Sequence, residues 1–306
     1  MPHKGHVVVI GDVMTDIIAI PEGPIVRGSD RRATIRLRPG GAGANQAIWL
    51  GALGVPVRFV GRVAAADVEL QARYFTRFGV GPRLVADPAA ASGVLVTLVD
   101  PDGERSFLTD RGANLNLSAA DLPPDLLDGA GLLLISGYAL FAEGPRSAVL
   151  AAVQEARARG IACAVDAASV AFLREVGVAQ FLAWTAGFDL LFANEEEAET
   201  LSGTADLSAE MAALGATYAK VIVKLGPSGA ALGGASGVAA REPAPIVDAL
   251  DTTGAGDAFA AGYLSAHLRG DDDRTALAAG VRAGSFAVTI IGAQPESLVE
   301  ASRLLG

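Results

Sequence analysis

The fold of this chain is indicated most clearly by one stretch, Asp251-Thr252-Thr253-Gly254-Ala255-Gly256-Asp257-Ala258-Phe259. A glycine-rich turn in this stretch leads directly into a helical pattern. Phe259, Tyr263 and Ala266 recur at helical spacing, and Arg269-Gly270 supplies a cationic last turn and a C-terminal stop. The glycine-rich turn therefore lies at a helix N-terminus, where backbone N–H groups lack partners within the helix.

Gly254, Ala255 and Gly256 are candidates for an anion hole, because their small side chains let an anion approach the unpaired amides. The helix dipole also favours negative charge there. Asp257 follows at once and has two interpretations. It either caps the helix, or it takes a proton from a hydroxyl whose oxygen attacks a phosphoryl group. With an ordinary pKa of about 4, its carboxyl group would be ionised at neutral pH.

Composition restricts the classes of partner. The chain has 306 residues, enough to bury a large core, and its net charge of −10 argues against nucleic acid, which needs a basic face. The lone cysteine, Cys163, excludes an internal disulfide framework. No signal peptide or membrane-spanning run is recognisable, so we expect a cytoplasmic protein with a small-molecule substrate and no membrane partner.

From about Val57 onward, short apolar runs of strand type alternate with helical patterns. This alternation predicts a doubly wound α/β fold, with a mostly parallel sheet and helices on both faces, as a single domain over residues 1–306. Ligands of such sheets bind at the carboxyl ends of the strands. The clearest predicted strands are 6–11, 132–135, 161–165, 190–192 and 220–224, and a helix is predicted over 145–159.

Two further segments, about residues 13–38 and 93–109, contain runs with the period of two that is typical of half-exposed strands. The second segment includes the turn Asp100-Pro101-Asp102-Gly103. We expect these segments to form one small antiparallel β-sheet, separate from the main sheet, that lies over the substrate pocket as a lid. Its outer face is a candidate homodimer interface.

Three polar or glycine-rich turns each have two interpretations. Gly40-Gly41, followed by Asn45, either makes a turn with close helix packing or lets a ligand approach. Asn194 and Glu197 either form an acidic helix N-terminus or hold Mg²⁺ through water. Lys224, at the end of a predicted strand, either meets a phosphate or caps a carbonyl group.

Together these motifs resemble the ribokinase-like (PfkB) family of carbohydrate kinases over most of the chain. Gly40-Gly41-Ala42-Gly43-Ala44-Asn45 matches the family's N-terminal signature, and residues 251–257 match its C-terminal signature. Asn194-Glu195-Glu196-Glu197 matches its Asn-x-x-Glu motif, and Gly292-Ala293-Gln294 resembles its closing loop. The resemblance implies a doubly wound domain with a β-sheet lid, and ATP-dependent phosphorylation of a sugar or nucleoside hydroxyl.

The resemblance also implies a role for each matching residue. Asp257 resembles the catalytic base, and Asp251 resembles the carboxylate of a monovalent-cation site that takes K⁺. The anion hole matches Gly254, Ala255 and Gly256; the substrate contacts match Asp16, Gly40, Gly41 and Asn45; the nucleotide contacts match Lys224, Gly226 and Gly229; the Mg²⁺ and phosphate motif matches Asn194 and Glu197, with Glu197 acting on Mg²⁺ through water.

The chain departs from ribokinases at positions that bear on the substrate. Ala42 stands where they usually have lysine, and Met14 where they have asparagine, which argues against ribose itself. Gly61-Arg62-Val63 lacks the Gly-x-Asp that usually follows it. Arg105 and Arg111, in or beside the lid, either meet an acidic or phosphorylated substrate or are solvated.

A kinase that transfers the γ-phosphoryl group of Mg·ATP to a sugar is therefore the expected function. A nucleoside kinase of the same fold is the nearest alternative, since Met14, Trp49 and Tyr138 can form a slot for a base. A catalytically idle, sugar-binding regulator is the alternative from another class, and the intact Asp257 argues against it.

Overall fold

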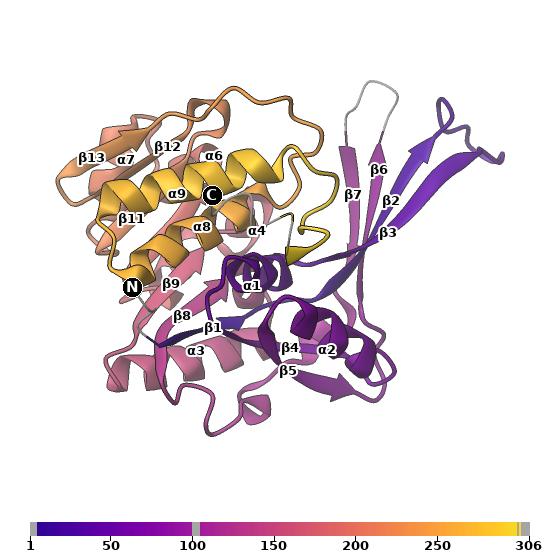
Figure 1. The fold of residues 1–306 in the computed structure, drawn as a ribbon, viewed down its shortest axis with the longest axis horizontal. Helices are drawn as coiled ribbons and strands as arrows, with labels where there is room; N and C mark the ends of the chain where they lie inside the picture. Colours follow the sequence, from indigo (N-terminus) through magenta and orange to yellow (C-terminus); the bar gives the residue numbers. More distant parts are fainter. Residues whose placement is uncertain (1–4, 100–104, 299, 301–306) are drawn as a thin grey trace.

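The computed structural model describes residues 5–99, 105–298 and 300, and a nine-stranded sheet forms its centre (Figure 1). The strand order is β13-β12-β11-β10-β9-β8-β1-β4-β5. Neighbouring strands from β5 to β11 run parallel, and β11, β12 and β13 pair antiparallel at one edge. The bounds are β1 (His6–Ile10), β4 (Val57–Ala64), β5 (Val80–Asp87), β8 (Ala130–Ser136), β9 (Ala162–Asp166), β10 (Leu190–Asn194), β11 (Lys220–Lys224), β12 (Ala230–Gly234) and β13 (Gly237–Glu242).

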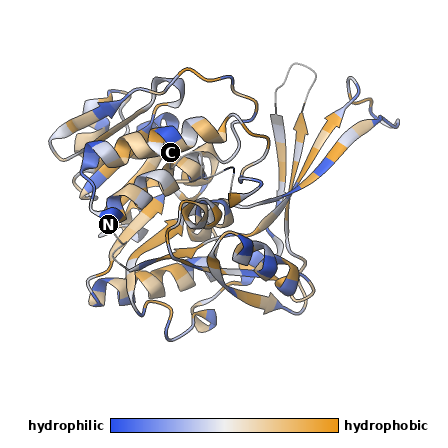
Figure 2. Ribbon diagram, viewed as in Figure 1, coloured by the Kyte–Doolittle hydropathy of each residue, from blue (hydrophilic) through white to orange (hydrophobic). Residues whose placement is uncertain are grey.

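The central strands are apolar over most of their length because helices cover both faces of the sheet (Figure 2). Successive side chains of a strand point to opposite faces. On β1, Val7 and Val9 enter one hydrophobic core, whereas Val8 and Ile10 enter the other. A strand with polar residues at alternate positions would leave one of these two cores incomplete.

The first core lies under α1 (Ala42–Ala52), α2 (Val68–Arg77), α8 (Ala255–Arg269) and α9 (Asp273–Ala287). The second lies under α3 (Glu143–Ala158), α4 (Val170–Val176), α5 (Val178–Trp184), α6 (Glu195–Ser202) and α7 (Leu207–Leu214). Short 3-10 helices occupy Gly112–Asn116, Ala119–Asp121, Gly137–Leu140 and Gly226–Ser228. None of the helices in the described residues combines the length and hydrophobicity that a membrane crossing needs.

A separate four-stranded sheet projects from the body in Figure 1, with the order β3-β2-β6-β7. We call this sheet the lid. Its strands are β2 (Met14–Pro21), β3 (Ala33–Gly40), β6 (Gly93–Val99) and β7 (Arg105–Asp110), and they agree with the two segments expected from the sequence. The predicted turn at residues 100–103 lies outside the described residues.

The doubly wound fold with its separate lid is confirmed, and one detail of the lid differs from the expectation. The outer pairs β2–β3 and β6–β7 are antiparallel, but the central pair β2–β6 is parallel. β2 follows β1 and β6 follows β5, and both β1 and β5 belong to the parallel part of the main sheet. Both lid strands therefore leave the body from the same edge and in the same direction.

Candidate active site

A cavity of about 320 Å³ lies between the carboxyl ends of the central strands and the lid. Its polar walls come from residues just after β1, at the ends of β9, β10 and β11, and at the start of α8. The lining residues are Asp12, Met14, Asp16, Gly41, Ala42, Asn45, Leu95, Thr109, Arg111, Tyr138, Asp166, Ala168, Phe172, Asn194, Glu197, Lys224, Thr253, Gly254, Gly256 and Asp257. The structure thus brings together most of the residues that the sequence singled out.

The carboxylate of Asp257 is held by two amides of α1. Asn45 Nδ2 donates to Asp257 Oδ2 at 2.9 Å, and Gln46 Nε2 donates to Asp257 Oδ1 at 3.0 Å. The oxygen of Asn45 in turn accepts from Gln294 Nε2 at 2.8 Å. These partners belong to α1 and to the closing loop. Side chains from outside α8 therefore orient the carboxylate, and it does not serve as the N-terminal cap of α8.

Burial raises the pKa of Asp257 to about 8, with the carboxylate of Asp166 adding to the shift. The hydrogen bond from Asn45 and the positive charge of Lys224 act in the opposite direction. The expectation of an ordinary pKa near 4 is therefore wrong. A group whose pKa lies close to the working pH is deprotonated often enough to accept a proton and also binds that proton well, as general acid–base catalysis requires.

The glycine-rich turn before α8 has a backbone that requires glycine. Gly254 has φ of 74°, and a Cβ there would collide with Ala293. A Cβ on Gly256 would lie 3.1 Å from Lys224 Nζ, so this glycine leaves space beside the ammonium group. Gly254 and Gly256 line the cavity, whereas Ala255 begins α8 and does not.

Lys224 ends β11 and forms a 2.7 Å ion pair with Asp166, which ends β9. Burial alone would lower the pKa of Lys224, and the neighbouring carboxylates of Asp166 and Glu197 reverse that effect, so the pKa lies above its ordinary value. The ammonium group is thus charged and lies beside the start of α8. Such a position suits contact with a phosphate.

Asn194 and Glu197 form the start of a helix and also line the cavity. Glu197 N donates to Asn194 Oδ1 at 2.8 Å and Asn194 N donates to Glu197 Oε2 at 2.9 Å, which forms a capping box at the start of α6. Both residues also line the cavity. Burial raises the pKa of Glu197, although Lys224 lowers it. The capping box leaves Glu197 Oε1 available to a ligand, since only Oε2 accepts the bond from Asn194.

Gly226 and Gly229 lie in the turn between β11 and β12 and do not line this cavity. Their φ values are 54° and 97°, and a Cβ on Gly229 would overlap the carbonyl oxygen of Glu242. The turn geometry alone therefore accounts for both glycines. Contact with a nucleotide remains a separate expectation for them.

Asp16 on β2 marks the lid side of the cavity. Its side chain is buried, and its Oδ1 has no hydrogen-bond partner in the structure. Burial, followed by the charges of Asp12 and Asp251, raises the pKa of Asp16 to about 7. Gly40 lies on the neighbouring strand β3, where it pairs with Met14, and a Cβ on Gly40 would overlap the Asp16 carboxyl group. The glycine signature therefore makes room for a carboxylate that can accept hydrogen bonds from a ligand.

Asp251 connects the turn before α8 to the closing loop. Its Oδ1 accepts from Thr253 N at 2.9 Å, and its Oδ2 accepts from Gly292 N at 3.0 Å. It lines a second cavity of about 190 Å³ beside the first, and Asp16 and Thr253 line both. Asp251 thus holds the turn in place through backbone amides.

Some residues of the site were not assigned a role from the sequence, among them Asp12, Asp166, Gln46, Gln294 and Phe172. The two aspartates do follow strands, and the two glutamines lie in the signature segments, so local patterns could have indicated them. Phe172 on α4 carries no such signal. Trp49 is excluded from the expected base slot, because it is fully buried and its indole N–H donates to Ala293 O at 3.0 Å.

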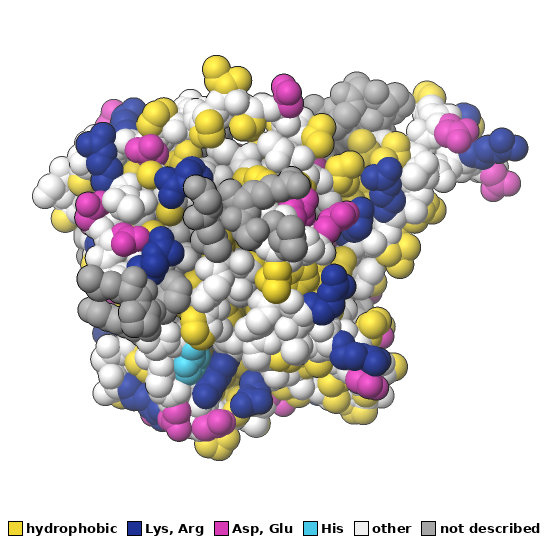
Figure 3. Space-filling model, viewed as in Figure 1, with side chains coloured by type: hydrophobic (Ala, Val, Ile, Leu, Met, Phe, Trp, Pro, Cys, Tyr) yellow, Lys and Arg dark blue, Asp and Glu magenta, His cyan; other side chains and the backbone are white. Residues whose placement is uncertain are grey.

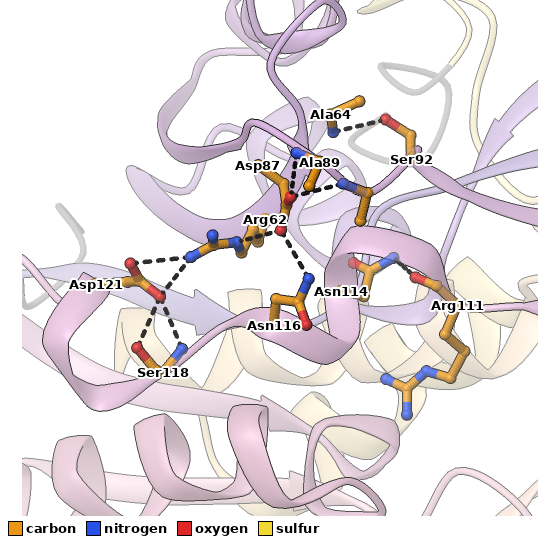
Figure 4. Close-up of polar contacts among 11 residues, drawn as sticks. Arg62, Ala64, Asp87, Ala89, Ser92, Arg111, Asn114, Asn116, Ser118 and Asp121 are labelled. Atoms are coloured by element: carbon orange, nitrogen blue, oxygen red, sulfur yellow. Dashed lines mark hydrogen bonds and ion pairs between the residues drawn. The ribbon is translucent and has the colours of Figure 1, made fainter.

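Arg62 lies in an ion-pair network that joins β4 to the segment after the lid (Figure 4). Its guanidinium pairs with Asp87 at 2.9 Å and with Asp121 at 3.0 Å. Asp87 also accepts from Asn116 Nδ2 at 2.8 Å and from two backbone amides, and these bonds hold its pKa well below the ordinary value. Although Gly61-Arg62-Val63 is not followed by Gly-x-Asp, Arg62 still forms ion pairs with Asp87 and Asp121. These contacts have a structural role.

The model of the pfkB family carbohydrate kinases matches residues 4–300. The chain belongs to the PfkB family of carbohydrate kinases. It is therefore a phosphotransferase of a family that includes sugar kinases and nucleoside kinases. Neither the site nor the comparisons support a catalytically idle regulator.

Relatives in the PfkB family differ in their substrates. A fructokinase of Klebsiella pneumoniae is 30% identical over 284 residues, which cover 86% of this chain and 84% of the relative. An aminoimidazole riboside kinase of Salmonella typhimurium is 30% identical and covers 96% and 92%. A putative ribokinase II of E. coli, solved with ATP and Mg²⁺, has a TM-score of 0.87 at 24% identity over 98% and 99% of the chains, which shows the shared fold.

Proposed function

We propose that the protein transfers the γ-phosphoryl group of Mg·ATP to a hydroxyl of a sugar, with Asp257 as the base. One observation supports the proposal above all others. A partly buried carboxylate with a raised pKa lies in one cavity with a glycine-rich helix N-terminus and with Lys224. This arrangement places a proton acceptor beside donors for a phosphoryl group, as positioning and electrostatic catalysis require.

In the proposed step the substrate hydroxyl oxygen attacks the γ-phosphorus, and the bond between that phosphorus and the ADP oxygen breaks. The hydroxyl proton passes to the carboxylate of Asp257. Asn45 and Gln46 keep the carboxylate oriented toward the cavity while leaving lone pairs on its oxygens. The proton transfer accompanies or follows the movement of the phosphoryl group, because a sugar hydroxyl is a weak acid.

Charge on the moving phosphoryl group would be held at the start of α8. The N–H groups around Gly254, Ala255 and Gly256 lack intrahelical partners at this end of the helix. Lys224 lies beside Gly256 and adds a full positive charge. We further infer that Gly226 and Gly229, in the turn after Lys224, contact the nucleotide.

Asn194 and Glu197 are the residues that would hold Mg²⁺ through water. Their oxygens suit a hard cation, and Glu197 Oε1 is not used by the capping box. Within residues 5–99, 105–298 and 300 no cluster of three or more metal-ligating side chains occurs, which fits an ion held mainly by phosphates and water. When bound, Mg²⁺ would neutralise charge on the phosphates.

A screen for ADP release tests this function. The full-length protein with Mg·ATP is offered neutral sugars, sugar acids, sugar phosphates and nucleosides, and release is followed with a coupled assay. We expect turnover with at least one sugar compound and none with nucleosides. Turnover with nucleosides alone would replace the proposed substrate class.

A nucleoside kinase is the second candidate, and the aromatic wall of the cavity favours it. Tyr138 and Phe172 line the cavity with ring centres 5.9 Å apart, and Met14 adds an apolar contact. A base could pack against this wall. The buried carboxyl groups of Asp12 and Asp16, which line the same cavity, instead suit hydroxyl groups, and they favour a sugar.

We also propose that a monovalent cation, K⁺ in preference to Na⁺, binds beside Asp251. Asp251 is buried, and its carboxylate joins the turn before α8 to the closing loop. A cation there would bind the carboxyl group of Asp251 and keep the turn ordered.

The lid and the body would work as one unit around the substrate, with the chain acting as a single domain. Lid closure over the cavity would exclude water from the reaction. Figure 3 shows hydrophobic side chains among charged ones on the projecting lid. On the outer lid face, Leu37 is 68% exposed and Leu108 is 61% exposed. We propose that a second copy of this chain covers that face.

A further inference from the structure

Arg111 stands out at the substrate end of the cavity because it is a cation among carboxyl groups. Asp12 and Asp16 line the same cavity. Lys224, the other cation among the lining residues, lies at the phosphoryl end and already pairs with Asp166. Within the described residues, Arg111 forms no ion pair. Its positive charge therefore has no partner of its own.

The guanidinium group of Arg111 is held in place from one side. Arg111 Nη1 donates to the carbonyl oxygen of Tyr138 at 2.8 Å, and the guanidinium carbon lies 5.9 Å from the centre of the Tyr138 ring. An arginine has five N–H donors, so this bond leaves four of them for other acceptors. Tyr138 in turn packs edge-on against Phe141 and Phe172, which fixes the ring.

The backbone of Arg111 is held as well. Its carbonyl oxygen accepts from Asn114 Nδ2 at 2.9 Å (Figure 4). The same buried amide binds Val13 through two further bonds, to the backbone N at 2.8 Å and to the backbone O at 2.9 Å. Val13 lies between Asp12 and Met14, so Asn114 fixes Arg111 relative to the floor of the cavity. A solvated lid residue would need no such anchoring.

The charge around the cavity is less negative than a count of carboxyl groups suggests. Burial raises the pKa of Asp16 to about 7 and that of Asp257 to about 8, so both carry less than a full charge near neutral pH. Arg36 lines the adjoining cavity and adds positive charge on the lid, whereas Arg38, which also lines that cavity, pairs with Glu296 at 3.4 Å. An anionic group can therefore enter next to Arg111.

We propose that the substrate is a sugar bearing a carboxylate or phosphate group, and that Arg111 binds this anionic group. A planar guanidinium can bind either group through two parallel hydrogen bonds, and an anchored guanidinium does so at a smaller cost in entropy. The proposal rests on the proposed kinase function, since the hydroxyl of the same substrate would face Asp257. Arg111 then sets the substrate class and its orientation.

Matched pairs of compounds test the proposal. Glucose is compared with gluconate and with glucose 1-phosphate, and ribose with ribose 1-phosphate. Binding to the full-length protein is measured by isothermal titration, and ADP release with Mg·ATP is measured separately. In at least one pair we expect the anionic member to bind about 10-fold or more tightly than the neutral one, the range for a charge-assisted hydrogen bond. The carboxylate and phosphate arms distinguish the two anionic groups.

Variants of Arg111 separate recognition from structure. Arg111→Gln should weaken binding of the anionic compound roughly 10- to 100-fold and leave the neutral partner within about 3-fold. Arg111→Lys keeps the charge without the fork and should recover part of the loss. Arg83→Gln removes an exposed charge on β5, outside the cavity lining, and should change the binding of neither compound.

Each outcome bears on one of the two claims. If no anionic compound binds more tightly than its neutral partner, or if Arg111→Gln weakens both partners equally, the role of Arg111 is wrong. If neutral sugars release ADP and anionic ones do not, the kinase function stands and this inference falls. If an anionic compound binds through Arg111 and no compound releases ADP, the role of Arg111 in binding the anionic group stands, and the proposed kinase function falls.

Discussion

Asn45 and Asp257 lie 212 positions apart in the chain, and their side chains meet in a hydrogen bond of 2.9 Å between Asn45 Nδ2 and Asp257 Oδ2. The bond joins the N-terminal signature on α1 to the C-terminal signature on α8. Gln294 extends the contact by donating to the oxygen of Asn45. Contacts among α1, α8 and the closing loop therefore fix the position of one carboxylate. A displacement of any of these three segments would move the carboxylate of Asp257.

Replacing Asp257 with Asn tests its role as base. The substitution keeps the shape and removes the proton acceptor, so we expect kcat to fall roughly 10²- to 10⁴-fold. Substrate affinity should change much less, because Asp16, Asn45 and the lid supply most of the proposed contacts. Steady-state kinetics with the sugar found in the screen gives both values.

Thermal melting of the same variant provides its control. At pH 8 the Asp257→Asn protein should melt at or above the wild-type temperature, because ionising the partly buried carboxyl group costs stability. Near wild-type turnover in a normally folded variant would show that Asp257 is not the base.

The activity should rise with pH. The pKa of Asp257 is raised to about 8, and the base must be deprotonated, so kcat/KM of the free enzyme should increase about tenfold per pH unit below 8 and level off above it. Asp16, with its pKa raised to about 7, adds a second rise if its ionised form accepts from the substrate. A profile that is flat between pH 6 and 9 would contradict both assignments.

Stability should change with pH in the opposite direction. Both carboxyl groups have a higher pKa in the folded state than the ordinary value of 3.8, so the native state binds more protons between about pH 4 and 8. The free energy of unfolding contributed by these groups therefore falls as the pH rises through that window. Denaturation curves of the wild type and of Asp257→Asn should diverge as the pH rises.

Gly40→Ala should impair substrate binding. The added Cβ would overlap the Asp16 carboxyl group, so Asp16 must move away from its present position. Because small misplacements of positioning groups are costly, we expect KM to rise about 10- to 100-fold with a smaller change in kcat. Gly81→Ala on β5 is the control, since its Cβ would lie 3.4 Å from Val57 O in ordinary contact. Equal kinetics for both variants would remove Asp16 from the substrate site.

K⁺ should support higher activity than Na⁺ or a large organic cation at equal ionic strength. The effect is expected because the cation would sit against the buried Asp251, which holds the turn before α8. Rates in the three salts provide the measurement. Equal rates in all three would count against a cation site there.

The outer lid face should form a dimer. Light scattering of the wild type is expected to give a dimer, and Leu37→Glu should give a monomer, because a charge would replace an apolar side chain that is 68% exposed. Leu70→Glu on α2 is the control, since Leu70 is 65% exposed and lies outside the lid. A wild-type monomer at every concentration would exclude this interface.

Much of the fold could be predicted because its signals are local. Apolar strands between helical patterns indicated the doubly wound sheet, and the period of two indicated the lid. The parallel pairing of β2 with β6 had no local signal, since it depends on how β1 and β5 lie in the main sheet. The antiparallel edge strands β12 and β13 are short and rich in Gly and Ala, so their apolar pattern is weak.

The site shows the same limit. Sequence motifs identified Asp257 and the glycine turn, but its pKa follows from burial and from Asp166, which lies far away in the sequence. Trp49 looked like a base contact because of its chemistry, and the structure buries it under the closing loop. The pKa of Asp257 and the burial of Trp49 both depend on where these residues lie in the folded chain. The spacing of residues in the sequence does not encode this.

The parallel pairing of β2 with β6 has a practical consequence for experiments on this chain. Since both strands enter the lid from the body, the exposed turn at residues 22–32 lies at the free end of the sheet, away from the cavity lining (Figure 1). Surface turns of this kind accept insertions. A fluorescent label placed there would report movement of the lid during turnover while leaving the reacting groups untouched.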